Sequence, residues 1–281
     1  MKVLWFLKGI LAVILSFFLS LLPGAFPRVP HEKKLDLVWA DEFDGNELDE
    51  TKWKICGESG TSVRRGSYWN LDMATVEDGN LHIRTQYYPK GYKGNGKPGW
   101  YTCGIDTSGL FEQKYGYFEV RCILPKGVGL WSAFWMQSNG MFKEDAGGTN
   151  GAEIDVMEAP FFGEKSNKKI TSNIHIDGYG EAHQSKKVCN AYVLFRNPYE
   201  EFNTYGVEWN EKQYTFYVNG IKTAKSDFGG ASQVPEYLLL SVEVGGENAV
   251  PADSWAGKAL ENDSEVTDFI VDYVRVYQYK Q

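Results

Sequence analysis

The chain consists largely of short apolar or alternating segments separated by Gly, Asn, Asp or Pro. No stretch shows long helical periodicity, so these segments predict β-strands joined by turns. Many short strands with almost no helix favour two antiparallel sheets packed as a sandwich or jelly roll over βαβ units. The segments are residues 79–88, 115–125, 130–138, 152–158, 171–177, 204–210, 213–220, 238–244 and 268–279.

The 281 residues fit one domain, since all-β sandwiches commonly reach about 250 residues as a single unit. We find no internal repeat and no linker after Leu37, and we expect a single domain over residues 27–281. Residues 1–26 carry Lys2 and Lys8 near their start and continue as a mostly apolar stretch, which predicts a secretory signal or an N-terminal anchor. We therefore expect an exported protein.

Composition narrows the classes of partner. The net charge of -8 argues against nucleic acid. Aromatic residues make up 15% of the chain, with 9 Trp and 17 Tyr, which suits a β-rich core and also suits flat surfaces that bind sugar rings. None of the cysteines forms a C-x-x-C pair, which argues against zinc, and their three possible disulfide pairings stay open: Cys56, Cys103, Cys122 and Cys189.

The segment GAEIDVMEAP carries the strongest chemical signal. Strand alternation places Glu153 and Asp155 on one face, but it would turn Glu158 to the opposite face. A β-bulge around Val156 and Met157 restores the parity, so that all three carboxyl groups point together. Three like charges on one face repel one another, which costs free energy of folding. A solvated outer strand would instead mix acids with Lys, Thr or Ser, so the pattern indicates catalysis.

The two neighbouring segments repeat this division into an apolar and a functional face. In LWSAFWMQ the functional face carries Trp131 and Trp135, and in SNIHID it carries Asn173 and His175. Core packing of the tryptophans and a structural role for His175 are the plain alternatives. We predict that these side chains line a concave sugar-binding surface bordered by the glycine-rich loop Ser138–Gly151, which we expect to move.

These residues resemble glycoside hydrolase family 16, and specifically its laminarinase-like members, whose catalytic strand reads E-[IL]-D-x-x-E. The similarity continues through five ordered segments along most of the chain after residue 37. They are WADEFDGNELDETKW, VEDGNLHIR, YTCGIDTSGLFEQKYGYFEVRCILPKGVGLWSAFWMQ, VEWNEKQYTFYVNG and IVDYVRVYQ.

The resemblance implies a concanavalin-like β-jelly-roll with a substrate cleft across its concave face. It implies Glu153 as nucleophile, Asp155 as an assisting carboxylate and Glu158 as general acid and then base. No cofactor is implied for catalysis. Family members often hold a structural calcium ion on the convex side, and the Gly79 carbonyl and the Asp272 carboxylate are the candidate ligands by resemblance.

The chain departs from the family pattern at two places near the site. It has Cys103, Gly104, Ile105 and Asp106 where the family often has S-G-R-I, and Trp131, Ser132 and Ala133 where the family has W-P-A. The Ser138–Gly151 loop is also longer than in a simple laminarinase. These departures leave the substrate open without touching the catalytic trio.

The sequence thus predicts a monomeric, retaining endo-β-glycoside hydrolase acting on polysaccharide. β-1,3-glucan or mixed-linkage β-1,3-1,4-glucan is the preferred substrate. An endo-β-galactosidase of the same family is one alternative, and a non-catalytic sugar-binding module with the same sandwich is another. A transglycosylase would use the same residues and differ only in whether sugar or water attacks the intermediate.

Overall fold

The computed structural model describes residues 29–56, 62–164, 167–245, 259 and 266–281. The predicted signal or anchor, residues 1–26, lies outside these ranges. In the described ranges, no helix has the length and apolar character needed to cross a membrane. The helical segments there are five short 3₁₀ turns: η1 (Glu32–Lys34), η2 (Leu71–Met73), η3 (Tyr92–Gly94), η4 (Asn139–Phe142) and η5 (Gly148–Asn150).

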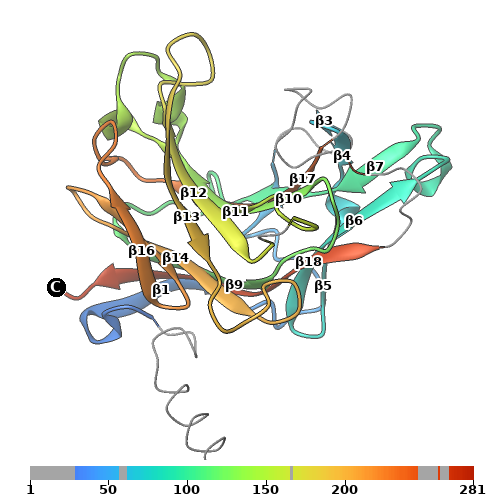
Figure 1. Cartoon of the computed structure of the whole chain (residues 1–281), viewed down its shortest axis with the longest axis horizontal. Helices are drawn as coiled ribbons and strands as arrows, with labels where there is room; N and C mark the ends of the chain where they lie inside the picture. Colours follow the sequence, from blue (N-terminus) through green and yellow to red (C-terminus); the bar gives the residue numbers. More distant parts are fainter. Residues whose placement is uncertain (1–28, 57–61, 165–166, 246–258, 260–265) are drawn as a thin grey trace, which may run out of the picture.

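The strands form two sheets packed face to face (Figure 1). One sheet has the order β13 (Gln184–Tyr192), β12 (Lys169–Ile176), β11 (Glu153–Ala159), β10 (Leu130–Gln137), β17 (Tyr237–Val244), β8 (Gly104–Asp106) and β2 (Lys54–Ile55). We call it the front sheet, because its outer face carries the predicted site. All of its strand pairs are antiparallel.

The second, back sheet has the order β16 (Ile221–Ser226), β15 (Tyr214–Val218), β14 (Asn203–Trp209), β9 (Gly116–Ile123), β18 (Thr267–Tyr279), β6 (Asn80–Tyr88), β7 (Gly99–Thr102), β4 (Ser67–Trp69) and β3 (Ser62–Arg64). Strand β1 (Leu35–Asp41) pairs with β18, and β5 (Ala74–Glu77) pairs with β6. The pairing of β4 with β7 is parallel and departs from the all-antiparallel expectation.

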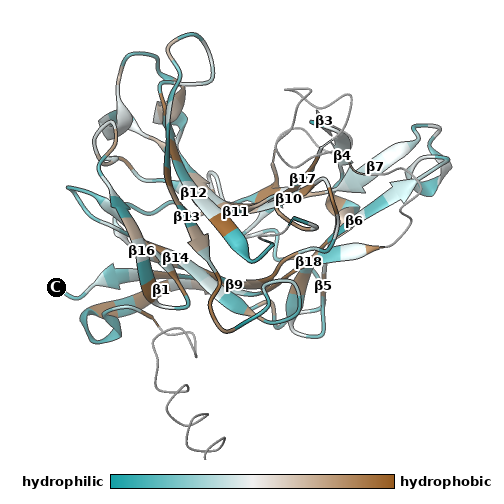
Figure 2. Ribbon diagram, in the orientation of Figure 1, coloured by the Kyte–Doolittle hydropathy of each residue, from teal (hydrophilic) through white to brown (hydrophobic). Residues whose placement is uncertain are grey.

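The space between the sheets is filled by the apolar face of each strand. Phe134 and Met136 on β10, Ile154 on β11 and Ile174 on β12 are fully buried there, against Phe118 of β9 in the back sheet. Figure 2 shows hydrophobic colouring concentrated on the central strands and hydrophilic colouring on the projecting loops. The predicted all-β sandwich of two sheets is confirmed, and alternation places the polar side chains of β10–β12 on the outer face.

The cysteines contribute apolar packing. Cys103 and Cys122 are fully buried free thiols within the core between the sheets. Burial raises the pKa of both thiols, so they remain protonated and behave as small hydrophobic side chains.

Candidate active site

The three predicted carboxylates lie on the outer face of β11 because the strand contains a bulge. Asp155 pairs with Asn173 and Glu158 with Thr171, so Val156 and Met157 together oppose a single residue of β12. Both side chains enter the core between the sheets, which returns Glu158 to the face that carries Glu153 and Asp155. The predicted bulge is therefore present at the predicted position.

These carboxylates are deeply buried for acidic groups. Glu153, Asp155 and Glu158 are 8%, 4% and 5% exposed. Burial, and secondly the charge of Glu153, raises the pKa of Asp155 well above its usual value. Burial, and secondly the charge of Asp155, likewise raises the pKa of Glu158 well above its usual value. A buried carboxyl with a raised pKa stays protonated near neutral pH and can donate that proton.

Neutral side chains hold two of the carboxyl groups. Glu153 Oε2 accepts hydrogen bonds from Gln137 Nε2, at 2.9 Å, and from the Tyr179 hydroxyl. Asn173 Nδ2 donates to Glu158 Oε2. Across the described ranges, no lysine or arginine forms an ion pair with the trio, so its negative charge is not balanced by a permanent cation.

Two histidines border the trio. His175 Nε2 lies 3.3 Å from Asp155 Oδ2 and 3.9 Å from Glu153 Oε1. On the other side of the ring, His175 Nδ1 lies 2.9 Å from His183 Nε2. Burial, and secondly His175, lowers the pKa of His183, which favours its neutral form. The structure thus places His175 beside the predicted nucleophile and its neighbouring carboxylate.

The two predicted tryptophans differ in their surroundings. Trp131 is partly exposed, and the Arg65 guanidinium carbon lies 4.5 Å from its ring centroid while Arg65 also pairs with Glu243. Trp135 is only 7% exposed and packs with Ala133, Tyr237 and Leu239 in a small apolar cluster on the outer face. Its Nε1 donates to Ser241 Oγ at 3.1 Å. Trp131 therefore offers more accessible ring surface to a sugar than Trp135.

The glycine-rich loop lies beside the site, as predicted, and is tied to the β12–β13 loop. Asp177 Oδ1 accepts hydrogen bonds from the backbone nitrogens of Ala146 and Gly147, at 2.9 and 2.8 Å. The backbone nitrogen of Gly178 donates to the carbonyl of Met141 at 2.7 Å. These bonds join residues 138–151 to residues 177–184 next to Glu153. Movement of the loop stays a prediction.

A further acid, Glu236, lies behind the site. It is fully buried, and its Oε1 accepts from the backbone nitrogen of Ala152, the residue before Glu153, at 3.2 Å. Burial raises its pKa to about 8, so it is mainly protonated at neutral pH. A neutral carboxyl at this place avoids another negative charge beside Glu153.

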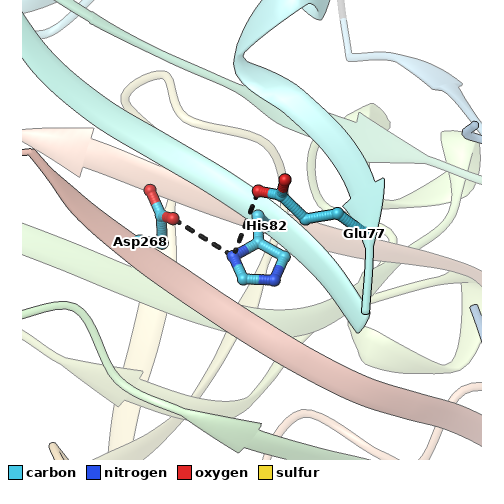
Figure 3. A group of neighbouring side chains, drawn as sticks. All are labelled: Glu77, His82 and Asp268. Atoms are coloured by element: carbon cyan, nitrogen blue, oxygen red, sulfur yellow. Dashed lines mark hydrogen bonds and ion pairs between the residues drawn. The ribbon is translucent and has the colours of Figure 1, made fainter. Parts of the chain in front are cut away.

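A second cluster with two carboxylates and a histidine lies on the outer face of the back sheet. Figure 3 shows Glu77, His82 and Asp268 converging from β5, β6 and β18, with His82 Nδ1 at 3.1 Å from Asp268 and 4.0 Å from Glu77. Arg84 also lies 3.3 Å from Asp268 and 3.6 Å from Glu77. A permanent cation already balances these carboxylates, so the cluster is poorly suited to a metal ion.

The residues predicted to hold calcium lie at the β5–β6 turn and on β18. Gly79 adopts a left-handed conformation in the turn, with φ of 71°, and Asp272 forms an ion pair with Arg121. The Asp272 carboxylate therefore already has a cationic partner, and the donors as arranged fit a calcium ion poorly. Calcium binding here stays a prediction.

The family described as "Beta-porphyranase A-D, GH16 domain" matches residues 35–279. The chain belongs to glycoside hydrolase family 16 (GH16). The family resemblance predicted from the sequence is therefore confirmed.

Individual relatives of this GH16 chain carry different names. It is 28% identical to "Glucan endo-1,3-beta-glucosidase A1" of Niallia circulans over 90% of the chain, although the match spans only 39% of that relative. It is also 28% identical to "Beta-porphyranase B" of Zobellia galactanivorans, over 91% of the chain and 88% of the relative. The solved laminarinase catalytic domain of Thermotoga maritima superposes with a TM-score of 0.70 at 27% identity, covering 88% of this chain and 100% of that domain.

Some residues of the site carried little sequence signal. Gln137 shares the face of Trp135 by alternation, so its position was foreseeable but its bond to Glu153 was not. Glu243 interrupts an apolar strand in the same alternating way. Tyr179 and His183 lie in a loop, where no periodicity indicates which side chain turns toward the carboxylates.

Proposed function

We propose that this GH16 domain is an endo-acting glycoside hydrolase that cleaves β-linked polysaccharide with retention of configuration. In this proposal Glu153 is the nucleophile, Glu158 the general acid and then base, and Asp155 the assisting carboxylate between them. One observation carries it: the bulge brings three buried carboxyl groups to one face without a permanent cation, in surroundings that raise the pKa of Glu158 well above its usual value.

In the first step Glu153 attacks the anomeric carbon as the glycosidic bond breaks. The departing oxygen takes the proton of Glu158, so the leaving group departs as a neutral alcohol. The product is a covalent ester between Glu153 and the sugar. Esterification also removes the charge of Glu153, which had disfavoured ionisation of Glu158.

In the second step Glu158, now ionised, accepts a proton from water as the water oxygen attacks the anomeric carbon. The bond to Glu153 breaks, the carboxylate reforms and Glu158 is protonated again. The same two residues therefore complete a double displacement that returns the original configuration. No cofactor takes part in either step.

The supporting contacts suggest how a sugar would be held. Trp131 offers ring surface for stacking, and His175 lies next to the carboxylates with a nitrogen able to contact a hydroxyl group. Asn173 already donates to Glu158, so contact with substrate would add to that bond. Roles for Trp131, Trp135, Asn173 and His175 in substrate binding are part of the proposal.

For the substrate we favour β-1,3-glucan or mixed-linkage β-1,3-1,4-glucan. The laminarinase and glucosidase names among the relatives support this choice. Charge supports it as well, because the Arg65 cation next to Trp131 is balanced by Glu243. A neutral glucan would not require that ion pair to open, whereas an anionic polysaccharide would gain most by breaking it.

A β-galactan of the porphyran type is the second candidate. The matched family description and the similarity to β-porphyranase B support it directly. The same carboxylates would act, and the difference would lie in the sugar contacts around Trp131 and the Ser138–Gly151 loop.

A panel of laminarin, lichenan, agarose, porphyran and mucin glycans, with products separated by chromatography, tests class and substrate together. Oligosaccharides of intermediate length from laminarin or lichenan would support an endo-glucanase. Release from porphyran alone would favour the second candidate. Binding without release would identify a sugar-binding module, and products longer than the starting oligosaccharide would identify a transglycosylase.

Two variants test the assigned roles. We expect Glu153→Ala to abolish turnover, because no nucleophile remains. We expect Glu158→Ala to be inactive on polysaccharide but partly rescued by azide, which attacks the glycosyl-enzyme and gives a β-glycosyl azide. An α-azide product would show a single displacement with net inversion and would overturn retention.

Three further expectations belong to the proposal. Export would follow from residues 1–26, and secretion of the full-length chain with loss of its N-terminus tests it. A monomer is expected, and light scattering tests it. Structural calcium would raise the melting temperature, and titration of the chelated protein with Ca²⁺ tests the Gly79 and Asp272 site.

A further inference from the structure

We propose that Tyr179 is a positioning residue for the nucleophile: with Gln137 it holds Oε2 of Glu153, so that Oε1 is the oxygen that attacks the sugar. This inference rests on the proposed function and adds an atomic assignment to it. Tyr179 lies on the β12–β13 loop, outside every strand and outside the acidic motif.

The hydrogen bonds around Glu153 are one-sided. Gln137 Nε2 and the Tyr179 hydroxyl both donate to Oε2, and Gln137 Nε2 also donates to the Tyr179 oxygen at 2.8 Å. Tyr237 fixes the orientation of the amide by donating to Gln137 Oε1 at 2.7 Å. The other oxygen, Oε1, lies 3.9 Å from His175 Nε2, which is too far for a hydrogen bond.

The loop that carries Tyr179 is fixed at its base. The left-handed conformations of Asp177 and Gly178, with φ of 63° and 73°, end β12 and turn the chain toward the site. The buried Asp177 carboxylate is then anchored by the backbone of Ala146 and Gly147 and by Gln184 Nε2. These hydrogen bonds fix the backbone from which the Tyr179 side chain projects.

Two rings orient Tyr179 further. Its ring contacts the edge of Phe142, with centroids 5.8 Å apart, and lies 5.9 Å from the ring of His183. Tyr179 is nevertheless 54% exposed, so these contacts bury too little surface for a large role in stability. An exposed tyrosine whose hydroxyl bonds a buried carboxylate is better explained by the function of that carboxylate.

The arrangement has a role in each chemical step. When Oε1 bonds to the anomeric carbon, Oε2 becomes the carbonyl oxygen of the ester and can keep both donors. When water releases the sugar, negative charge returns to the carboxylate, and the Tyr179 and Gln137 donors stabilise it. The Tyr179 hydroxyl therefore holds the carboxylate in position while Oε1 forms the ester, and it stabilises the negative charge when the ester is broken.

The test is Tyr179→Phe in the full chain, assayed on the polysaccharide that the wild-type protein cleaves. Removing a hydrogen bond to a charged group should lower kcat by about 10- to 100-fold with little change in KM. The acidic limb of the kcat/KM profile should move to higher pH, because the nucleophile has lost a hydrogen-bond donor. A purely structural residue would not move that limb.

Two other variants separate the hydroxyl from the ring. Phe142→Leu alters the ring contact and keeps the hydroxyl, so its acidic limb should stay in place. Tyr279→Phe removes a hydroxyl that donates to Glu208 at 2.6 Å on the outer face of the back sheet, and its activity and pH profile should match the wild type. Tyr179→Ala should shift the acidic limb as far as Tyr179→Phe does.

The outcomes distinguish this inference from the proposed function. An active wild type, an inactive Glu153→Ala and a Tyr179→Phe with unchanged kcat and acidic limb would overturn the role of Tyr179 alone. A shift confined to Tyr179→Ala would overturn it too, since the ring rather than the hydroxyl would then matter. Loss of retention in the azide experiment would instead overturn the proposed function on which this inference rests.

Discussion

Two clusters in this GH16 domain have the same chemical composition and opposite electrostatics. Each brings two carboxylates and one histidine within 4.8 Å: Glu153, Asp155 and His175 on the front sheet, and Glu77, Asp268 and His82 on the back sheet. Arg84 joins the second cluster, and hydrogen bonds from His82 and Arg84 lower the pKa of Asp268 although burial opposes them. On the front sheet, burial raises the pKa of Asp155 well above its usual value.

The comparison shows that the residue types alone do not determine what a cluster can do. A carboxylate balanced by a guanidinium stays ionised and serves as part of a surface ion-pair network. A buried carboxyl held by neutral amides and hydroxyls, with other acids nearby, retains a proton that it can donate. Exchanging these two environments by substitution should therefore change what each cluster can do.

Ala133→Lys places a cation opposite Glu158, because Ala133 is its cross-strand partner on β10. The ammonium group should lower the pKa of Glu158 and remove the general acid near neutral pH, for a loss in kcat of about 100- to 10,000-fold. The basic limb of the kcat profile should move to lower pH. Ala133→Met has similar length without charge and should retain far more activity; equal loss in both variants would attribute the effect to packing.

Asn173→Ala tests the neutral donor. Its hydrogen bond lowers the pKa of Glu158, so its removal should raise that pKa further and move the basic limb of the kcat profile to higher pH. This direction is opposite to that expected for Ala133→Lys. A downward shift would mean that the amide does not stabilise the ionised form of Glu158.

Arg84→Gln removes the cation from the back-sheet cluster. The folded-state pKa of Asp268 is depressed, so this group stabilises the protein above its unfolded pKa and the stabilisation is lost as pH falls through the folded value. The ion pair is partly exposed, and the variant should lower the free energy of unfolding at pH 7 by only about 0.5 kcal/mol. Urea denaturation at pH 7 and pH 3 should show a smaller difference at the lower pH. Activity should not change.

Much of the fold was accessible from sequence because alternation has a direct physical cause. Every segment predicted as a strand forms one, since each buries an apolar face between the sheets. Several strands were not among those predictions, and β13 shows one reason: its first half carries the exposed Lys186 and Lys187, because it lies at the edge of the front sheet, where charged residues are tolerated.

In the candidate site, too, the residues on strands were predictable from alternation and the residues on loops were not. The alternation of side chains along the strand, interrupted by one bulge, predicted that the three carboxylates share a face. The electrostatic repulsion among them indicated a catalytic role. The Tyr179 bond to Glu153 depends on two left-handed residues and on bonds between loops about 30 residues apart in the chain, as with Asp177 and Gly147. Such contacts leave no periodic trace. The burial of Trp135 against Tyr237 was equally invisible, because it depends on which strand lies beside β10.

The bulge in β11 also makes the orientation of the catalytic strand robust. Two consecutive side chains, Val156 and Met157, insert into the core, and exposing either one would cost about 1.5 to 3 kcal/mol. Loss of one of these residues would restore plain alternation and would still leave three acids on the outer face. Gain or loss of one residue normally inverts all later side chains of a strand. Here, the loss of Val156 or Met157 would leave the direction of the proton donor unchanged, so a one-residue deletion beside the reacting groups need not turn the general acid inward.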